Sequence, residues 1–415
     1  MNEIARFANK LVHMDPVDVL LADVAVRIQL SPTDHAKAES RYGTVAAWID
    51  RHDSPLHGRV GLVYPQGSMA IGATVARYSE RDEYDIDLMA QIDIWRGATP
   101  KSVLDTLHDA IRGDRGSRYW GKTERRTRCV TIFYEDGMHL DVTPAERRGI
   151  TPERESDIFH SKPEDPAEPE MRVVANPFGF GDWFKGRTPA DDAFGLYFEK
   201  RSLDEARLQA LAKADADPVP EQVPAYRKSK AVIALQLLKR WRNILYDRRQ
   251  GQRRPPSILM SWSIASHANR TETLFEELVW QAEALRTILQ EADRLSSLVH
   301  VENPICQADV FTDRWPKSRA DQQKFIEDLT AFLRDMAILR RAETPSEMLP
   351  ILERLFGERP AREAVRGYFE RAGAAATSGS GLVLPKTGRI PVAVTGLSVA
   401  PGIARSSPKH TFFGA

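Results

Sequence analysis

The sequence predicts an α/β (α+β) protein in which a mixed sheet is packed on a helical C-terminal lobe. In residues 1–150, runs such as YDIDLMAQIDI alternate apolar and polar side chains and are rich in Ile and Leu, which is typical of strands. Beyond residue 225 nearly every segment has the apolar spacing of a helix. The Pro-bearing stretch ADADPVPEQVP between these halves is typical of a linker. We therefore expect an α/β lobe with N-terminal helices over 1–215, a helical lobe over 216–373 and a flexible tail over 374–415.

The elements of the α/β lobe are predicted from capping and spacing. Residues 1–30 have apolar positions at mixed helical spacing, so we expect one or two short helices there. A helix is expected over 31–49, because the serine at its start can cap it and Pro32 suits the first turn. A strand is expected at 60–64 and a further helix at 99–111.

The rest of the chain is predicted from its loops, its helical spacing and its last residues. The segment from 149 to 225 is loop-rich and has one expected helix, at about 201–214. The tail over 374–415 has four Lys or Arg and no Asp or Glu, and it ends in FFGA. The helices expected between these regions cover 226–249, 257–268, 271–298, 319–342, 345–356 and 360–373.

Composition excludes several classes of protein. The 58 basic and 58 acidic side chains balance among 415 residues, so no obligatory duplex-DNA partner is expected. The two cysteines, Cys129 and Cys306, cannot build a disulfide framework or a four-thiolate zinc site, and they suit a reducing cytosol. No apolar run approaches the length that spans a bilayer, so no membrane partner is expected.

The chemistry of the chain centres on the stretch QGSMAIGATVARYSERDEYDIDL, residues 66–88. Asp85 and Asp87 lie on one predicted strand and, being two residues apart, point to the same face. Two neighbouring carboxylates repel each other unless a cation lies between them, and Mg²⁺ prefers such oxygen ligands. Upstream, Gly67 has no Cβ and lets a ligand approach the backbone, while the Ser68 hydroxyl can bind phosphate oxygens. A phosphate cradle followed by a metal-binding strand predicts a nucleotidyltransferase.

A third carboxylate completes the predicted metal site. RCVTIFYEDGMHLDVTPAE indicates two strands joined at a turn at Asp136-Gly137, and the second strand carries Asp141. A mixed sheet could place Asp141 beside Asp85 and Asp87. Three such aspartates can hold two Mg²⁺ ions, with Mn²⁺ as an alternative.

These residues resemble the polymerase-β-like nucleotidyltransferases and, more narrowly, the bacterial CD-NTases (SMODS family), which are cyclic oligonucleotide synthases related to cGAS. The resemblance covers roughly 55–316 and also rests on ANPFGFGDWF, KSKAVIALQLLKRWRN and VENPICQADVFTDRW. It implies a polymerase-β-like core and a two-metal enzyme that joins nucleoside triphosphates, ATP among them. The implied product is a cyclic di- or trinucleotide second messenger for CBASS antiphage signalling in the bacterial cytoplasm.

The resemblance also implies further contacts to the nucleotide. Gln66 accompanies Gly67 and Ser68 in the expected phosphate-binding turn. Lys228, Ser229 and Lys230 begin a strongly apolar helix, where cations are unfavourable for the helix dipole. Either they form a solvated first turn, or one lysine reaches across a cleft to the triphosphate; Lys230 and Ser229 are the favoured contacts. Further along this helix, side chains expected at the protein surface are Lys239, Arg240 and Arg242.

Two alternatives to a cyclic product stay open, and so does the role of the tail. The chain could instead add nucleotides to RNA or to a protein hydroxyl without a template, or it could be a non-catalytic regulatory member of the fold. Some synthases of the resembled family have their C-terminus joined to a target by a ubiquitin-transfer-like accessory protein. This makes the α-carboxylate of Ala415 a candidate for conjugation, and a plain unconjugated end is the alternative.

Overall fold

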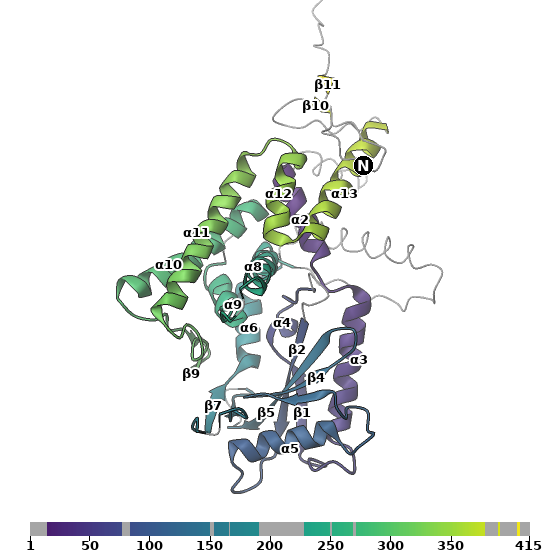
Figure 1. Ribbon diagram of the computed structural model, residues 1–415, viewed down its shortest axis with the longest axis vertical. Helices are drawn as coiled ribbons and strands as arrows, with labels where there is room; N and C mark the ends of the chain where they lie inside the picture. The colour runs from purple at the N-terminus through teal and green to yellow at the C-terminus, as the bar shows by residue number, and fades with distance from the viewer. Residues whose placement is uncertain are drawn as a thin grey trace, which may run out of the picture.

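The computed structural model has a sheet-containing lobe and a helical lobe, which Figure 1 shows one above the other. Backbone is described for residues 15–76, 84–149, 153–165, 167–190, 228–249, 251–268 and 271–377, with two short strands, β10 (Arg389–Ile390) and β11 (Arg405–Ser406), beyond them. The helix expected at 201–214 and Ala415 lie outside the described residues.

The sheet is mixed, as expected. Its main path has the order β1-β2-β5-β4-β3, in which β2 and β5 are parallel and the other neighbours antiparallel. A further antiparallel pair, β6 and β7, continues from β5. The strands are β1 (Val60–Pro65), β2 (Tyr84–Ile92), β3 (Thr123–Arg125), β4 (Val130–Phe133), β5 (Met138–Arg147), β6 (Ser156–His160) and β7 (Met171–Ala175).

One face of the sheet is covered by two helices, α3 (Pro32–Ile49) and α5 (Pro100–Arg112). Helix α3 begins where expected, because the Ser31 hydroxyl accepts a hydrogen bond from the Asp34 amide at 3.1 Å. Alternate residues of β2, with Ile86 and Leu88 among them, are fully buried in the core under these helices. Since side chains alternate along a strand, Asp87 lies on the opposite face.

The helical lobe is built around α8 (Lys230–Asp247), whose sides are covered by other helices (Figure 1). The other helices are α2 (Pro16–Arg27), α6 (Pro177–Arg187), α9 (Ser257–Ser266), α10 (Leu274–Arg294), α11 (Arg319–Arg341), α12 (Pro345–Phe356) and α13 (Glu358–Thr377). A short hairpin of β8 (Glu302–Asn303) and β9 (Cys306–Val310) precedes α11. No described helix is both long and apolar enough to cross a membrane.

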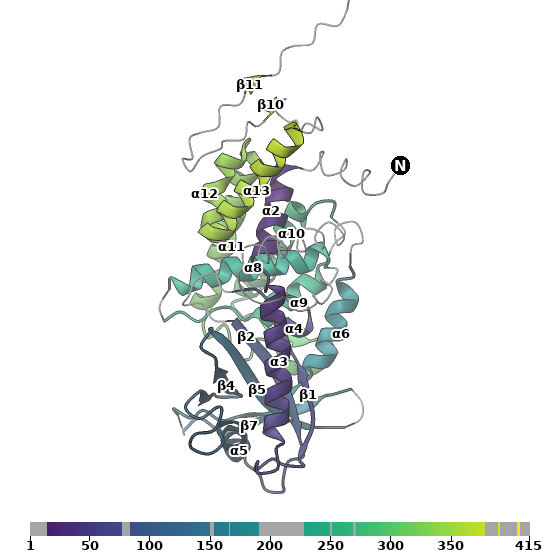
Figure 2. The same cartoon turned by 90° about the vertical axis from the view of Figure 1, so that its right-hand side faces the viewer.

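Packing divides the chain differently from its order in the sequence. Helix α2 comes first among the described elements, yet its buried side chains belong to the core of the helical lobe, and Figure 2 shows it beside α13. The boundary expected at residue 215 itself lies outside the described residues. Part of the N-terminal segment therefore supports the second lobe.

The expectation that the basic residues of α8 lie at the surface is wrong. Lys239, Arg240 and Arg242 are 6%, 2% and 5% exposed. They are buried because α8 has neighbours on all sides, and backbone carbonyls accept hydrogen bonds from the charged groups of Lys239 and Arg242. The Arg242 guanidinium, for example, donates to the Pro255 carbonyl at 2.7 Å.

Candidate active site

Two of the three predicted metal ligands lie side by side in the sheet. Parallel pairing of β2 with β5 sets Asp87 directly opposite Asp141 and the backbone of Asp85 opposite His139. The side chain of Asp85 lies outside the described residues. Within the described part of the chain, no group of three or more His, Cys, Asp or Glu side chains is placed to hold a metal ion. Asp87 and Asp141 still provide the hard oxygen ligands that Mg²⁺ prefers.

The Gly-Ser turn is in contact with Asp87. Gly67 has φ +60°, and a Cβ built there would lie 2.3 Å from Asp87 Oδ2. The preceding amide, that of Gln66, donates to the Asp87 carbonyl at 2.8 Å. A glycine is therefore needed at this position both for its backbone conformation and for the closeness of the carboxylate. Ser68 follows in the short helical turn α4 (Gly67–Ala70).

Asp141 is held from the other side by β4. The Thr131 hydroxyl donates a hydrogen bond to Asp141 Oδ1 at 2.5 Å, and the other carboxylate oxygen, Oδ2, does not take part in this bond. The Cys129 thiol also interacts with Asp141. Burial, followed by the negative charges of Asp141 and Asp87, raises the pKa of Cys129 well above its usual value. Cys129 and Thr131 were not predicted as site residues, although their strand leads into the turn before Asp141.

The segment after the Gly-Ser turn is attached to the helical lobe. Gln236 of α8 donates to the Thr74 carbonyl at 2.7 Å, and Lys239, one turn further along, donates to the Ala73 carbonyl at 2.8 Å. Apolar side chains of the same segment lie in the helical-lobe core, among them Ile71 and Val75. The expected phosphate-binding turn thus spans the two lobes, because it meets β2 at its start and α8 at its end.

The start of α8 has a different environment from the solvated turn considered above. Lys228 Nζ donates to Gln29 Oε1 at 2.7 Å, and burial lowers the pKa of Lys228 from 10.5 to about 7. Ser229 is the N-cap and accepts from the Val232 amide at 3.3 Å. Lys230 Nζ lies 3.5 Å from the Glu272 carbonyl. Lys228 is therefore the unusual member of the three.

A chain of side-chain amides links Lys228 to the Gly-Ser segment. The amide nitrogen of Gln29 donates to Gln236 Oε1 at 3.0 Å, and Gln236 in turn donates to the Thr74 carbonyl at 2.7 Å. Lys228 also donates to Gln29, as described above. The two groups of residues predicted to bind phosphate are thus connected through partly buried hydrogen bonds.

The two Asn-Pro segments of the sequence meet at the junction of β7 and the β8–β9 hairpin. Asn176 caps α6 by accepting from the Gly179 amide at 2.8 Å. Asn303 Nδ2 donates to the Asn176 carbonyl at 3.0 Å and to Asp309 Oδ2 at 2.9 Å. Burial raises the pKa of Asp309. These contacts join the end of the sheet to the helical lobe.

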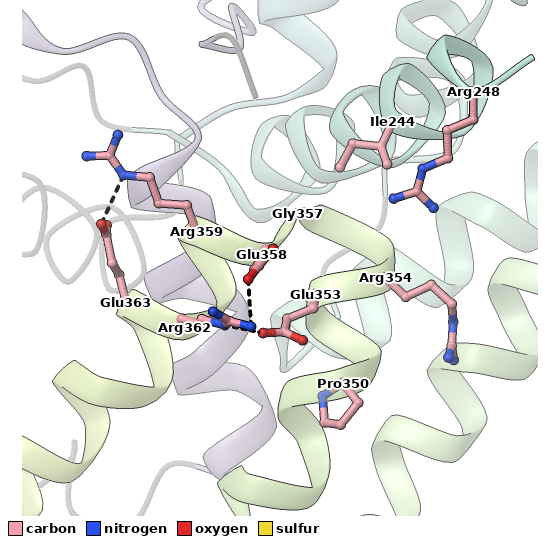
Figure 3. Close-up of a pocket in the computed structure, with 10 residues that line it drawn as sticks. All are labelled: Ile244, Arg248, Pro350, Glu353, Arg354, Gly357, Glu358, Arg359, Arg362 and Glu363. Atoms are coloured by element: carbon pink, nitrogen blue, oxygen red, sulfur yellow. Dashed lines mark hydrogen bonds and ion pairs between the residues drawn. The ribbon is translucent and has the colours of Figure 1, made fainter. Parts of the chain in front are cut away.

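A cavity of about 870 Å³ lies at the far end of α8, between α12 and α13 (Figure 3). Its lining includes none of the residues described above. The charged side chains around it are largely paired, as Figure 3 shows for Arg362 with Glu353 and Glu358. We therefore place the candidate active site at the carboxylates rather than at this cavity.

Known proteins are similar to this chain over nearly its whole length. The profile described as "Second Messenger Oligonucleotide or Dinucleotide Synthetase domain" (SMODS) matches residues 16–162, which include Gly67, Asp87 and Asp141. Cyclic dinucleotide synthase CdnG of Bradyrhizobium diazoefficiens is 38% identical over 408 residues, covering 96% of this chain and 95% of the relative. A c-di-GMP synthase of Roseivirga ehrenbergii is 23% identical over 399 residues, covering 95% and 96%.

A solved structure is also similar. The structure of Bradyrhizobium diazoefficiens CdnG in complex with GTP aligns with a TM-score of 0.73 at 37% identity. The alignment covers 85% of this chain and 98% of the solved one.

Proposed function

The chain belongs to the SMODS family of bacterial CD-NTases, nucleotidyltransferases that synthesise cyclic oligonucleotides, and on that premise we propose that its product is a cyclic dinucleotide. We further propose GTP as one substrate, because relatives of this chain are named for cyclic dinucleotide or c-di-GMP synthesis and one was solved with GTP. The observation that carries the proposal is the contact of the Gly-Ser turn with Asp87, which lies opposite Asp141.

We assign the metal site to Asp85, Asp87 and Asp141. When bound there, two Mg²⁺ or Mn²⁺ ions would lower the pKa of the acceptor hydroxyl and neutralise charge on the donor phosphates. The protein positions the ligands for this: the Thr131 hydroxyl binds one oxygen of Asp141, and Gly67, having no Cβ, leaves room for Asp87 Oδ2 beside the turn. The carboxylates are thereby held before the nucleotides bind, which preorganisation requires.

The donor nucleotide lies, in this proposal, with its phosphates on the Gly-Ser turn. Gln66 and Gly67 place the backbone there, and the Ser68 hydroxyl donates to a phosphate oxygen. Lys228, Ser229 and Lys230 form the far side of the phosphate site. Lys228 suits this role best, because a nearby triphosphate would restore the charge that burial disfavours.

The transfer itself is an in-line displacement. A ribose hydroxyl of the acceptor nucleotide attacks the donor α-phosphorus, and a new P–O bond forms as the bond to pyrophosphate breaks. The hydroxyl proton passes to solvent or to a carboxylate. A second transfer, after the linear product turns over in the site, closes the ring.

The test is product analysis with a matched carboxylate control. Labelled nucleoside triphosphates are incubated with the protein and Mg²⁺, and the products are digested with phosphatase and nuclease. A cyclic product is a small molecule that keeps its label on phosphatase treatment. A free linear oligonucleotide loses its terminal 5′-phosphates under phosphatase, and a nucleotide joined to RNA or to a protein hydroxyl stays attached to the macromolecule. Testing each pair of triphosphates, ATP included, identifies the second base.

Asp87→Asn should abolish product formation, since loss of a metal ligand removes much of the charge stabilisation of the transition state. Asp93→Asn is the control, because Asp93 is an exposed aspartate just after the same strand. We expect it to keep wild-type turnover. Undiminished product from Asp87→Asn would contradict the assignment of the site.

The cellular role proposed from the family is CBASS antiphage signalling in the bacterial cytoplasm. We keep conjugation of Ala415 by a ubiquitin-transfer-like accessory protein as a separate proposal, which rests on the sequence of the tail alone. Co-expression with neighbouring genes, followed by mass spectrometry, tests it. A conjugate joined through Ala415 supports the proposal, and unchanged signalling after deletion of the last residues argues against it.

A further inference from the structure

Three arginines converge on the side of the carboxylates away from the Gly-Ser turn. The sheet order β1-β2-β5-β4 makes this side clear. The turn follows β1, Asp87 lies on β2 and Asp141 on β5, so β4 is the next strand beyond Asp141. The arginines are Arg128 in the β3–β4 connection, Arg253 between α8 and α9, and Arg314 between β9 and α11.

The positions of Arg128 and Arg314 near Asp141 follow from the chain and from one ion pair, and Arg253 lies close enough to Arg314 for its charge to act on it. Arg128 directly precedes Cys129, the residue whose thiol interacts with Asp141. The Arg128 guanidinium is 2.5 Å from Asp313 Oδ2, and Arg314 is the next residue after that aspartate. The cluster therefore joins the β4 edge of the site to the helical lobe.

The cluster has three arginines and two nearby carboxylates, Asp313 and Asp309, so its net charge remains positive. Asp313 pairs with Arg128, which is also held by a hydrogen bond to His160 at 3.0 Å. Arg253 and Arg314 are exposed, and neither forms a hydrogen bond or ion pair with the residues that the structure describes. The surrounding protein and then the charges of Arg128 and Arg253 lower the pKa of Arg314. Like charges held together in this way favour an anion.

We propose that Arg253 and Arg314, supported by Arg128, bind the 5′-triphosphate of the acceptor nucleotide. This inference rests on the proposed function and adds a second phosphate subsite to it. The acceptor of the first transfer is itself a nucleoside triphosphate, and its phosphates cannot occupy the turn that holds those of the donor. The 5′-phosphates and the attacking hydroxyl lie at opposite ends of the ribose. A hydroxyl at Asp141 therefore places the triphosphate beyond Asp141, on the β4 side.

The experiment separates the two nucleotides chemically. The donor is 2′,3′-dideoxy-GTP, which has no hydroxyl to act as acceptor. The acceptor is either α,β-methylene-GTP, which has the triphosphate charge but cannot lose pyrophosphate, or GMP. In each case one P–O bond forms and pyrophosphate leaves the dideoxy donor. The value of kcat/KM for each acceptor is measured at saturating donor, for wild type, Arg253→Ala, Arg314→Ala and Arg314→Lys.

We expect wild type to prefer the triphosphate acceptor by about tenfold or more in kcat/KM, because charged hydrogen bonds to phosphate usually contribute that much binding energy. Both alanine variants should lose most of this preference while their kcat/KM for GMP stays near the wild-type value. Arg314→Lys, which keeps the charge, should recover part of it. Arg254→Ala is the matched control, since Arg254 is an exposed neighbour that is not among the main charges acting on Arg314; it should behave as wild type.

Two outcomes would overturn the inference. In the first outcome, the alanine variants lose activity equally with both acceptors, or they keep the full preference for the triphosphate acceptor. Either result would show that transfer occurs but that the arginines do not bind the acceptor phosphates. In the other, the wild-type protein transfers to no nucleotide at all under conditions in which it is folded. That result contradicts the proposed function, and the inference falls with it.

Discussion

Replacing Gly67 with alanine should damage catalysis much more than folding. The new Cβ would lie 2.3 Å from Asp87 Oδ2, whereas an ordinary contact begins at 3.4 Å, so the carboxylate must move by roughly 1 Å. A displacement of that size at a reacting centre typically lowers the rate about 100-fold. The positive φ of +60° adds about 1–2 kcal/mol of backbone strain. This strain should lower the melting temperature by no more than about 4–8 °C.

Gly72→Ala is the matched control for this substitution. Gly72 has φ +68° and lies just after the same turn, but a Cβ there would meet nothing within 4 Å. It should therefore show the same loss of stability with little loss of turnover. The assay is the initial rate of pyrophosphate release at saturating nucleotide, together with thermal unfolding of both variants. Turnover of Gly67→Ala within about threefold of Gly72→Ala would refute the reasoning, because the contact with Asp87 would then have no catalytic consequence.

Two further predictions concern pH. Burial raises the pKa of Asp18 from 3.8 to about 6, while its side chain accepts from the Phe275 amide at 2.8 Å. The folded state then binds more protons than the unfolded state between these values, so this group's contribution to stability falls as pH rises through them. Above pH 6, Asp18→Asn should be more stable than wild type by at most about 3 kcal/mol. Thermal unfolding should show that this advantage disappears near pH 4. An equal difference in stability at both pH values would contradict the prediction. For Lys228, whose pKa burial lowers to about 7, the charged form declines as pH rises from 7 to 9. The Kd for nucleotide should therefore rise by up to about tenfold per pH unit over that range. In Lys228→Met, the Kd should depend much less on pH. If the Kd of the variant changed with pH as steeply as that of wild type, Lys228 would not be the source of the pH dependence.

The attachment of the Gly-Ser segment to α8 has a consequence for how the site is assembled. Gln236 and Lys239 bind the carbonyls of Thr74 and Ala73, and the start of the turn is bonded to β2. A shift of the helical lobe would therefore move the turn relative to Asp87 and Asp141. If the donor phosphates bind at this turn, as proposed, the packing of the two lobes sets their distance from the carboxylates.

Local sequence patterns determined much of the predicted site and several of its supporting elements. The alternation in YDIDL predicted Ile86 and Leu88 in the core and Asp87 on the opposite face, because successive side chains of a strand point to opposite faces of the sheet. The Asp136-Gly137 turn placed Asp141 on a strand paired with β4, as expected. Capping residues determined the start of α3, and the motifs identified the family that the comparisons confirm.

Tertiary structure alone decided what depends on contacts between distant segments. The parallel register that sets Asp87 against Asp141 arises from packing across some fifty residues of intervening chain, and no local pattern encodes it. The same holds for the burial of Lys239, which looks like a surface residue until α8 is surrounded, and for the shielding that lowers the pKa of Lys228. It also holds for Arg253 and Arg314, which loops bring close to each other and to Arg128. Periodicity records which way a side chain points, whereas its neighbours depend on how the elements fill space together.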